Sequence, residues 1–414
     1  MEIEKRKRDG DKRPFHIAIN AHLLSGEAGY RRAGIHHYIA QVLRHLPQQA
    51  DTGYTIFSRC GDDLPERADF VLQGSRWPTE RRSVRILWEQ LIWPWQSRQV
   101  DLMHSMAFVI PFIQPCPAVV TVYDLSFLHF PEQFPALQRW YLSSQSRRSC
   151  RAAKRVITIS ESSRQDVHTF FGVPLSRIEV VVPGVNGRYH PLPIAQITAF
   201  RQKHSLPDRF ILHVGTLQPR KNIPILLEAL AKLTDKTIPL VLAGGKGWLY
   251  DDIFAQIEAL GLADRVIFPG YVADEDLPLW YNAAALFAFP SLYEGFGMPV
   301  VEAMACGTPV VAANASSIPE AVGEAGLLFD AQDAAQLAER MATVLGDSAL
   351  SATMRATGLQ HAKTFSWEAA GEKTAVIYRQ ILNETTDAAQ TRRDAKNRYY
   401  QSTFSAPTAI DNHQ

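Results

Sequence analysis

Two glutamates, Glu294 and Glu302, stand eight positions apart in the stretch "SLYEGFGMPVVEAMACGTPVV", residues 291–311. The stretch lies between an apolar strand pattern and an apolar helix pattern. Gly295 and Gly297 would let backbone N–H groups approach a ligand closely. The first turn of the following helix offers free N–H donors and a partial positive charge. The pattern predicts an anion site flanked by carboxylates that suit sugar hydroxyls. On spacing alone, a tight turn followed by a solvated helix residue explains it equally well.

Adjacent cations mark a second segment, "HVGTLQPRKNIPILLEAL" at 213–230, which follows a strand–loop–helix pattern. Gly215 and Thr216 end the strand, and Arg220 and Lys221 stand where the loop meets the helix. A planar Arg fork beside a Lys point charge suits a diphosphate. A lone Arg–Lys pair is usually a solvated surface pair, but the position at a strand end favours a binding role.

The elements that position these residues form two series of short apolar strands separated by longer helical patterns. The first series is expected at 15–19, 54–58, 100–104, 118–123, 155–160 and 178–182, and the second at 210–214, 238–244, 265–270, 285–290, 309–313 and 326–329. Continuous apolar strands alternating with helices are typical of parallel sheets covered on both faces. The sequence thus predicts an α/β protein.

The two series are separated by 183–208, which is rich in Pro, Gly and His, and we interpret the centre of this stretch as a connection. The sequence therefore predicts two facing Rossmann-like domains, at 14–190 and 208–365. Their ligands should lie in a deep cleft between them, at the carboxyl ends of the strands. Residues 366–383 form an amphipathic helix pattern, which is expected to return to the N-terminal domain, and 384–414 are expected to be a flexible tail.

Composition excludes several classes of protein. The 414 residues are 46% hydrophobic and 21% charged with a net charge of +1, which fits a globular protein and gives no reason to expect a nucleic-acid partner. The four cysteines contain no CxxC pair, and the histidines show no metal-ligand spacing, so we expect free thiols and no metal site. Neither a signal peptide nor an apolar membrane span is visible, so a cytoplasmic location is expected.

Several motifs in order resemble one enzyme family. In the carboxyl-terminal half they are "GTLQPRKN", "GYVADEDLPLWYNAA", "FPSLYEGFGMPVVEAMACGTPVVAAN" and "PEAVGEAGLLFD"; in the amino-terminal half, "AGIHHYIAQVL", "WEQL", "VYDLSFLHFPEQFP" and "ITISESSRQDV". The set resembles the GT4-type retaining glycosyltransferases with the GT-B fold, with Glu294 and Glu302 as their E-x7-E motif. The amino-terminal motifs resemble the bacterial branch that contains mannosyltransferases of O-antigen and exopolysaccharide assembly.

The resemblance implies roles for the carboxyl-terminal residues. Arg220 and Lys221 would bind the diphosphate of a nucleotide-sugar donor, beside the strand end at Gly215 and Thr216. Glu302 would bind the ribose. The remaining donor contacts would come from the Glu294 carboxylate, which holds hydroxyls of the transferred sugar, and from the backbone at Gly295, Phe296, Gly297 and Met298.

In the amino-terminal half, the resemblance places Gly34 at the start of a helix whose N-terminus faces the phosphates. Asp124 would face the anomeric carbon and the acceptor, which makes it a catalytic candidate with Arg220, Lys221 and Glu294. Tyr123 stands where related sequences often carry His. A phenol can still donate a hydrogen bond to the sugar, but it stays neutral near pH 7.

The resemblance implies a retaining, metal-independent hexosyltransferase that needs no cofactor besides its nucleotide-sugar co-substrate. GDP-mannose is the favoured donor, and the acceptor is a saccharide or a lipid-linked saccharide. A UDP-sugar-dependent transferase, a sugar-nucleotide epimerase of the same fold and a non-catalytic sugar-nucleotide-binding scaffold are the alternatives. The tryptophan-rich segment 85–99 is either a core helix or a peripheral contact with the inner face of a membrane.

Overall fold

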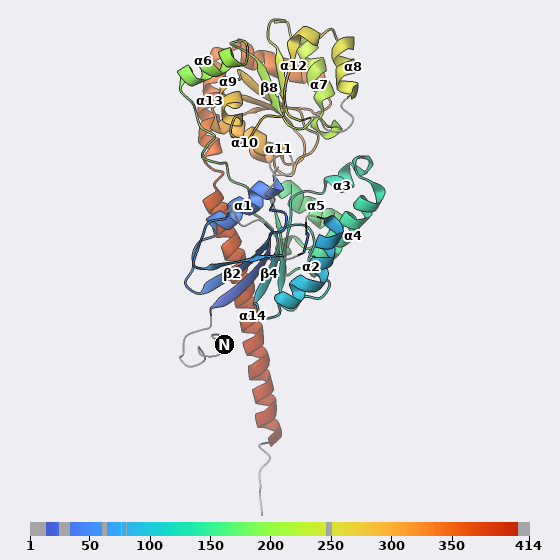
Figure 1. The fold of residues 1–414 in the computed structure, drawn as a ribbon, viewed down its shortest axis with the longest axis vertical. Helices are drawn as coiled ribbons and strands as arrows, with labels where there is room; N and C mark the ends of the chain where they lie inside the picture. The colour runs from blue at the N-terminus through green and yellow to red at the C-terminus, as the bar shows by residue number, and fades with distance from the viewer. Residues whose placement is uncertain are drawn as a thin grey trace, which may run out of the picture.

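The computed structural model describes residues 14–24, 34–59, 64–75, 77–79, 81–245 and 251–404. It consists of two α/β halves, one above the other in Figure 1, each built around its own parallel sheet. In both halves most residues of the central strands are buried, as their continuous apolar sequences predict.

The N-terminal sheet has seven strands in the order β3-β2-β1-β4-β5-β6-β7. Every pairing in it is parallel. The strands are β1 (Phe15–Asn20), β2 (Thr52–Ser58), β3 (Phe70–Gly74), β4 (Leu102–Ser105), β5 (Ala118–Val122), β6 (Arg155–Thr158) and β7 (Ile178–Val180). The helices are α1 (Ile35–His45), α2 (Arg82–Gln96), α3 (Ser126–His129), η2 (Pro131–Gln133), α4 (Ala136–Ala152), α5 (Glu161–Phe171) and η3 (Leu175–Arg177).

The C-terminal sheet has six parallel strands in the order β10-β9-β8-β11-β12-β13. The strands are β8 (Ile211–Val214), β9 (Leu240–Ala243), β10 (Val266–Gly270), β11 (Leu286–Phe289), β12 (Val310–Ala313) and β13 (Leu327–Phe329). The helices are α6 (Ile194–Lys203), η4 (Pro219–Lys221), α7 (Ile223–Lys232), α8 (Asp251–Ala259), η5 (Ala263–Arg265), α9 (Leu277–Ala283), α10 (Met298–Ala305), α11 (Ile318–Val322), α12 (Ala334–Gly346) and α13 (Ser348–Ala362).

The last helix, α14 (Trp367–Phe404), leaves the C-terminal half and returns to the N-terminal one, where it packs along α1 (Figure 1). Gly371 allows this close packing, because a Cβ there would collide with the backbone of His45. Further along, the Tyr378 hydroxyl lies 2.5 Å from Nδ1 of the buried His104. Helix α14, which follows the C-terminal half in sequence, thus packs on the N-terminal half and connects the two.

The predicted strands of both series are confirmed. The edge strand β3 was not predicted: its pattern is short, and its Val71 and Leu72 are exposed. The predicted flexible tail is wrong from 384 onward, because α14 continues to Phe404; residues 405–414 lie outside the described part. Within 183–208, predicted as a connection, α6 packs against α9 of the C-terminal half, with Arg201 donating to the Ala283 carbonyl.

Candidate active site

An ion-pair cluster lies at the carboxyl ends of two adjacent strands of the C-terminal sheet. The 3-10 helix η4 follows β8 and carries Arg220 and Lys221, while Glu294 follows β11. Arg220 Nη1 donates to Glu294 Oε2 at 2.9 Å, and Lys221 Nζ donates to Glu294 Oε1 at 2.7 Å. Arg220 also donates to the Tyr293 carbonyl at 2.7 Å. The two segments that the sequence singled out therefore form one site.

Burial and charge compete at this cluster. Burial alone would raise the pKa of Glu294, but the charges of Lys221 and Arg220 and the hydrogen bonds outweigh it and lower the pKa to about 2. Burial lowers the pKa of the Lys221 ammonium, and Glu294 opposes that effect. The Lys221 ammonium also lies 5.2 Å from the centre of the Phe289 ring. At neutral pH the cluster holds two cations against one carboxylate, an excess of one positive charge.

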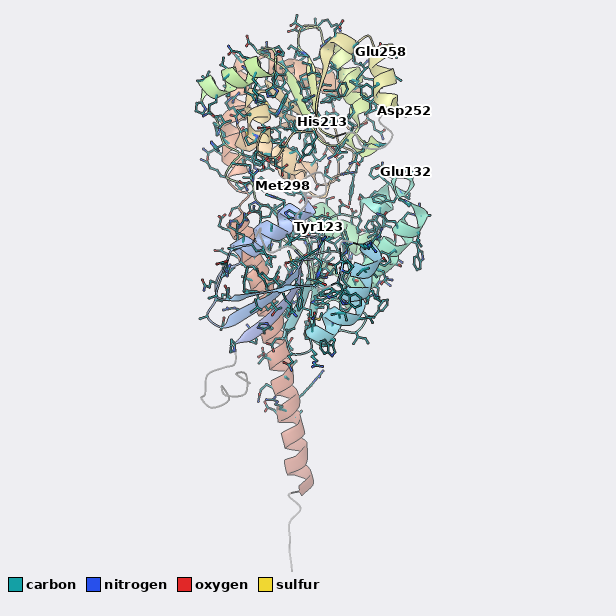
Figure 2. All side chains as sticks on the ribbon, viewed as in Figure 1. Tyr123, Glu132, His213, Asp252, Glu258 and Met298 are labelled. Atoms are coloured by element: carbon teal, nitrogen blue, oxygen red, sulfur yellow. The ribbon has the colours of Figure 1, made fainter. Side chains whose placement is uncertain are left out.

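The loop after Glu294 combines tight packing with an open helix end. Gly297 has φ of +107°, a left-handed conformation that favours glycine, and directly precedes α10. The N-terminus of α10 lacks a side-chain cap. Pro299 has no N–H, and the Val300 N–H donates to the Gly297 carbonyl at 2.9 Å, so the Met298 N–H is the donor that the first turn leaves for a ligand. Phe296 is buried and packs edge-on against Phe365, so only its backbone is available to a ligand. Figure 2 shows Met298, the first residue of α10, at the edge that faces the N-terminal half.

Two serines that the sequence analysis did not select hold the Glu294 backbone in place. Ser316 Oγ accepts a hydrogen bond from Glu294 N–H at 2.8 Å, and Ser317 Oγ donates to the Glu294 carbonyl at 2.8 Å. Ser316 has φ of +46°, a strained conformation for serine. Both serines follow β12, the strand next to β11. Their position after a predicted strand was the one feature of the sequence that could have marked them as site residues.

Glu302 lies inside α10 and faces a separate polar group. Its Oε2 accepts a hydrogen bond from the Tyr281 hydroxyl at 3.0 Å. Burial raises the pKa of Glu302 to about 7, with Asp274 adding to the rise and the Tyr281 and Tyr189 hydroxyls opposing it. This carboxyl therefore changes its charge near neutral pH, unlike Glu294.

Gly215 and Thr216 follow β8 beside the cluster. A Cβ on Gly215 would lie 3.3 Å from the Lys221 side chain and 3.4 Å from Nε2 of His213. Glycine at this position therefore leaves room for the Lys221 side chain. His213 is buried, and burial lowers its pKa to about 4. Its Nε2 has no hydrogen-bond partner among the residues that the structure describes. This unpaired nitrogen near the Lys221 side chain was not selected from the sequence.

In the N-terminal half, Asp124 follows β5. Its Oδ1 accepts hydrogen bonds from the backbone and the hydroxyl of Ser126, at 2.9 and 2.8 Å. Its charge reaches Arg220 of the other half, since it raises the pKa of that guanidinium after the larger effect of Glu294. Gly34 directly precedes α1, as predicted.

Tyr123 is placed differently from the expected sugar contact. Its hydroxyl donates to the Met106 carbonyl at 2.6 Å inside the N-terminal half, and its ring packs edge-on against Tyr38. Its backbone is closer to the other half: a Cβ on Gly295 would lie 2.7 Å from the Tyr123 carbonyl oxygen. The glycine therefore lets the two halves pack backbone against backbone.

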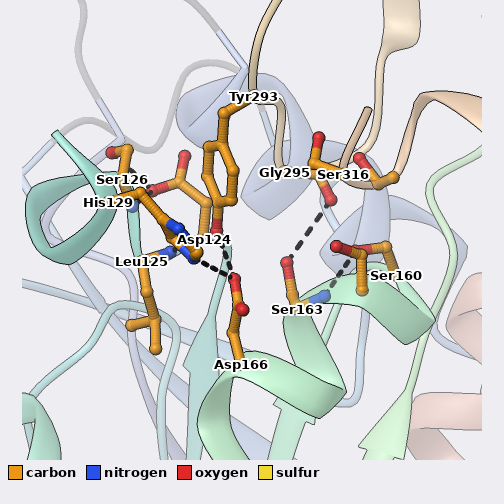
Figure 3. Close-up of polar contacts among 12 residues, drawn as sticks. Asp124, Leu125, Ser126, His129, Ser160, Ser163, Asp166, Tyr293, Gly295 and Ser316 are labelled. Carbon is orange, nitrogen blue, oxygen red and sulfur yellow. Dashed lines mark hydrogen bonds and ion pairs between the residues drawn. The ribbon is translucent and has the colours of Figure 1, made fainter. Parts of the chain in front are cut away.

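Hydrogen bonds of Tyr293 also join the two halves (Figure 3). The Tyr293 hydroxyl accepts from the Leu125 N–H at 3.1 Å and donates to Asp166 Oδ2 at 2.7 Å. His129 Nε2 lies 2.9 Å from the same Asp166 oxygen. Elsewhere on the interface, the Glu320 carboxylate accepts from the first N–H groups of α5 at 2.7 and 2.8 Å. These contacts fix the Asp124 segment against the Glu294 segment, and they link residues far apart in sequence.

The arrangement can bind an anion and polyhydroxyl groups together. Two cations and an uncapped helix N-terminus suit a phosphate group, and carboxylates on either side suit hydroxyl donors. Among the described residues, no group of three or more His, Cys, Asp or Glu is placed to hold a metal ion.

The sequence matches the models of two glycosyltransferase families. Residues 32–187 match "Glycosyltransferase Family 4", and residues 196–361 match "Glycosyl transferases group 1". The matches cover the N-terminal and C-terminal halves respectively, and the two facing parallel sheets form the GT-B fold. The chain therefore belongs to the family 4 glycosyltransferases.

Its relatives include bacterial mannosyltransferases. It is 38% identical to the O-antigen chain mannosyltransferase B of Escherichia coli over 69% of this chain and 76% of that one. It is 30% identical to the serotype-specific mannosyltransferase WbdA of Escherichia coli over 67% of this chain, which spans only 35% of WbdA. Among solved structures, Anabaena HepE in complex with UDP and glucose has a TM-score of 0.69 at 22% identity, over 88% of this chain and 100% of HepE.

Proposed function

We propose that this protein transfers mannose from GDP-mannose to a saccharide acceptor, with retention of the anomeric configuration. The observation that carries the proposal is the Arg220–Lys221–Glu294 cluster beside the open N-terminus of α10, with Glu302 one turn further on. The cations and the Met298 amide suit the diphosphate, Glu294 the hexose hydroxyls and Glu302 the ribose. The relatedness to O-antigen mannosyltransferases supports mannose as the sugar and, through it, a GDP donor.

In the proposed reaction, the bond from the anomeric carbon to the diphosphate breaks, and its electron pair leaves with the nucleoside diphosphate. Arg220, Lys221 and the Met298 amide at the start of α10 stabilise the charge that develops on the phosphate. The acceptor hydroxyl forms the new bond on the same face and gives its proton to the departing phosphate oxygen. Asp124 orients the reacting groups from the N-terminal half. In this scheme Arg220 and Lys221 hold the diphosphate without a metal ion.

Nucleotide binding tests the donor. We expect GDP to raise the unfolding temperature more than UDP or ADP at equal concentration, because binding to the folded state adds RT ln(1 + [L]/Kd) to stability. GDP affinity should also fall about tenfold between pH 8 and pH 6 through Glu302. Ribose hydroxyls favour its charged form, whereas its pKa without ligand is about 7. Titration calorimetry at several pH values measures this dependence.

The control is Glu302→Gln, whose side chain cannot ionise. The pH dependence of GDP affinity that remains in this variant comes from the phosphate, and the difference from the wild type is the contribution of Glu302. Stabilisation by UDP alone would contradict the GDP donor and favour a UDP-sugar-dependent transferase. Turnover without release of free nucleoside diphosphate would favour an epimerase. Binding without any transfer would leave the scaffold alternative.

A lipid-linked acceptor would bring this protein to a membrane, and one surface suits that contact. Within the described residues, no helix is long and apolar enough to cross a membrane. Helix α2 exposes Leu87, Leu91 and Trp95 at spacings of four residues, which places them on one stripe. Phe112, whose N–H donates to Gln90 of α2, is also exposed, as are Ile113 and, on α4, Leu137 and Trp140. We call these seven residues the α2–α4 surface.

The positive charge of α4 favours an anionic lipid membrane as the partner of this surface. Helix α4 carries four arginines and no acidic residue: Arg139, Arg147, Arg148 and Arg151. The Arg148 guanidinium lies 4.0 Å from the Phe112 ring centre, so cations and apolar side chains are interleaved. Such a surface can insert apolar side chains while each arginine near the lipid adds about 1 kcal/mol.

Vesicle co-sedimentation tests the α2–α4 surface. We expect binding to vesicles that contain phosphatidylglycerol and much weaker binding to pure phosphatidylcholine. Leu91→Ser with Trp95→Ser should abolish the difference, whereas Tyr271→Ser, which changes an exposed aromatic residue of the C-terminal half, should not. Equal binding by both variants would contradict the assignment, as would self-association of the wild type through this surface in light scattering.

A further inference from the structure

A cavity of about 260 Å³ lies in the N-terminal half, outside the cluster at Arg220 and Glu294. Its walls come from segments far apart in sequence: Leu23 after β1, Arg85 and Glu89 of α2, Phe108 after β4, and Tyr141 of α4. Leu23 and Phe108 follow the carboxyl ends of their strands. In open α/β sheets this is the edge where ligands bind.

Glu89 lies in the wall of this cavity, and its carboxylate has few partners among the described residues. Only 14% of its side chain is exposed. The hydrogen bond from Asn20 Nδ2 is long, at 3.3 Å, and Arg85 Nε stands 3.8 Å away, beyond hydrogen-bond distance. Burial raises the pKa of Glu89 to about 7, against the opposing effects of Arg85 and Asn20. A carboxylate that is costly to bury and has few partners is expected where a ligand completes its hydrogen bonds.

Phe108 gives a second, independent indication. Its φ is +51°, a left-handed conformation that is strained for a bulky residue. Such strain persists mainly at functional sites. The Phe108 N–H donates to the Thr121 carbonyl at 2.8 Å, and its ring lies 5.9 Å from that of Tyr123, the neighbour of Asp124. The strained residue thus forms the wall between the cavity and the Asp124 segment.

The chemistry of the walls favours a neutral sugar. Glu89 can accept hydrogen bonds and Arg85 can donate them, and a sugar hydroxyl does both. Phe108 and Tyr141 supply aromatic surface for the apolar face of a ring. A phosphate would gain from Arg82 and Arg85 but would meet the Glu89 charge. The volume is slightly below the range of about 300–1,000 Å³ typical of small-molecule pockets, which fits one sugar ring better than a nucleotide.

We propose that this cavity binds the sugar residue of the acceptor that receives the transferred hexose, with Glu89 and Tyr141 as hydrogen-bonding partners of its hydroxyls. The proposal rests on the function proposed above and names the acceptor side of that site. It assigns a binding role to "WEQL", a motif that the resemblance noted without a function.

Acceptor kinetics test this assignment. Glu89→Gln keeps the size of the side chain but loses its charge, and a hydrogen bond to a charged group corresponds to about 10- to 100-fold in affinity. We expect the acceptor KM to rise by that factor, with the donor KM changed by less than about twofold. The probes are a panel of hexose and N-acetylhexosamine disaccharides with GDP-mannose, or with the sugar nucleotide of whichever base stabilises the protein most. Tyr141→Phe should raise the acceptor KM by about two- to tenfold.

The control is Glu66→Gln, the same chemical change at an exposed position of the N-terminal half, which should leave both KM values unchanged. An unchanged acceptor KM in Glu89→Gln would overturn the assignment, as would equal rises in the donor and acceptor KM, which indicate general damage. Tyr141→Phe decides the question if Glu89→Gln does not fold. Failure of the wild type to transfer sugar to any probe would instead count against the proposed function.

Discussion

Replacing Lys221 with alanine should lower kcat by about 100- to 1000-fold, the usual effect of removing one preorganised donor to a developing charge. Lys221 is buried, and its ammonium lies 2.7 Å from a Glu294 oxygen. Because this ammonium is already shielded from water, its electrostatic attraction to the leaving phosphate is stronger than that of an exposed lysine. Steady-state transfer measured as nucleoside diphosphate release gives the effect.

The matched control is Lys232→Ala, which removes an exposed lysine from α7 of the same half and should leave kcat within about twofold. Lys221→Ala should still fold, because Arg220 continues to pair with Glu294. Its unfolding temperature should be lower, since Glu294 loses one of its two cations. Undiminished turnover in Lys221→Ala would refute the proposed diphosphate role.

The sequence predicted the site's cations and carboxylates because they follow strands within short, motif-like segments. Arg220 and Lys221 follow β8, and Glu294 follows β11, so a parallel sheet must bring them to one edge. It did not predict that Glu294 would be paired with both cations in the free protein. The pairing depends on the pitch and twist of adjacent strands and on side-chain rotamers, which spacing alone does not contain.

The contacts between the two halves could not be predicted from the sequence. Tyr293 pairs with Asp166, and Glu320 caps α5, across separations of 127 and of 158 to 159 residues. Neither pair leaves a local pattern, because each depends on how two independently folded sheets face each other. The same applies to Tyr123: its position at the end of β5 was predictable, but the direction of its hydroxyl toward Met106 depends on packing with Tyr38 and Phe108.

The length of α14 was missed for a different reason. The amphipathic pattern ends near Glu384, whose carboxylate pairs with Arg155 of β6, and the sequence that follows, from 385 to 395, is mostly polar. A polar stretch without apolar periodicity is compatible with both a helix and a coil. In the structure, Glu384 holds this part of the helix against the N-terminal sheet, because its carboxylate pairs with Lys154 at 2.8 Å and with Arg155 at 2.5 Å. These partners are too far away in sequence to be predicted from a local pattern.

Glu294→Gln should lower transfer about 1000-fold or more while leaving nucleoside diphosphate binding as tight as in the wild type, or tighter. The variant loses a charged hydrogen-bond partner of the sugar, about 10- to 100-fold, and the ion pairs that orient Arg220 and Lys221, about a further 100-fold. A free nucleoside diphosphate, however, meets two cations without their competing carboxylate. Titration calorimetry with GDP and steady-state kinetics separate the two effects.

Stability gives an independent check on the same variant. Ion pairing lowers the folded-state pKa of Glu294 from 4.5 to about 2. Its contribution to stability is therefore fully present above pH 4.5 and is lost as the pH falls toward 2. Without nucleotide, Glu294→Gln should unfold at a lower temperature than the wild type at pH 7, and this difference should shrink as the pH falls. Saturating GDP should restore much of the lost stability by replacing the missing negative charge.

The control for this variant is Glu258→Gln, which changes an exposed carboxylate on α8 and should change none of these properties. In Figure 2 Glu258 lies at the outer end of the C-terminal half, away from the edge marked by Met298. Parallel losses of GDP binding and transfer in Glu294→Gln would show that the carboxylate only maintains the local fold. Loss of transfer with retained GDP binding would place Glu294 on the sugar. The carboxylate would then hold the two cations in position before the donor binds and exchange them for the sugar hydroxyls when it arrives.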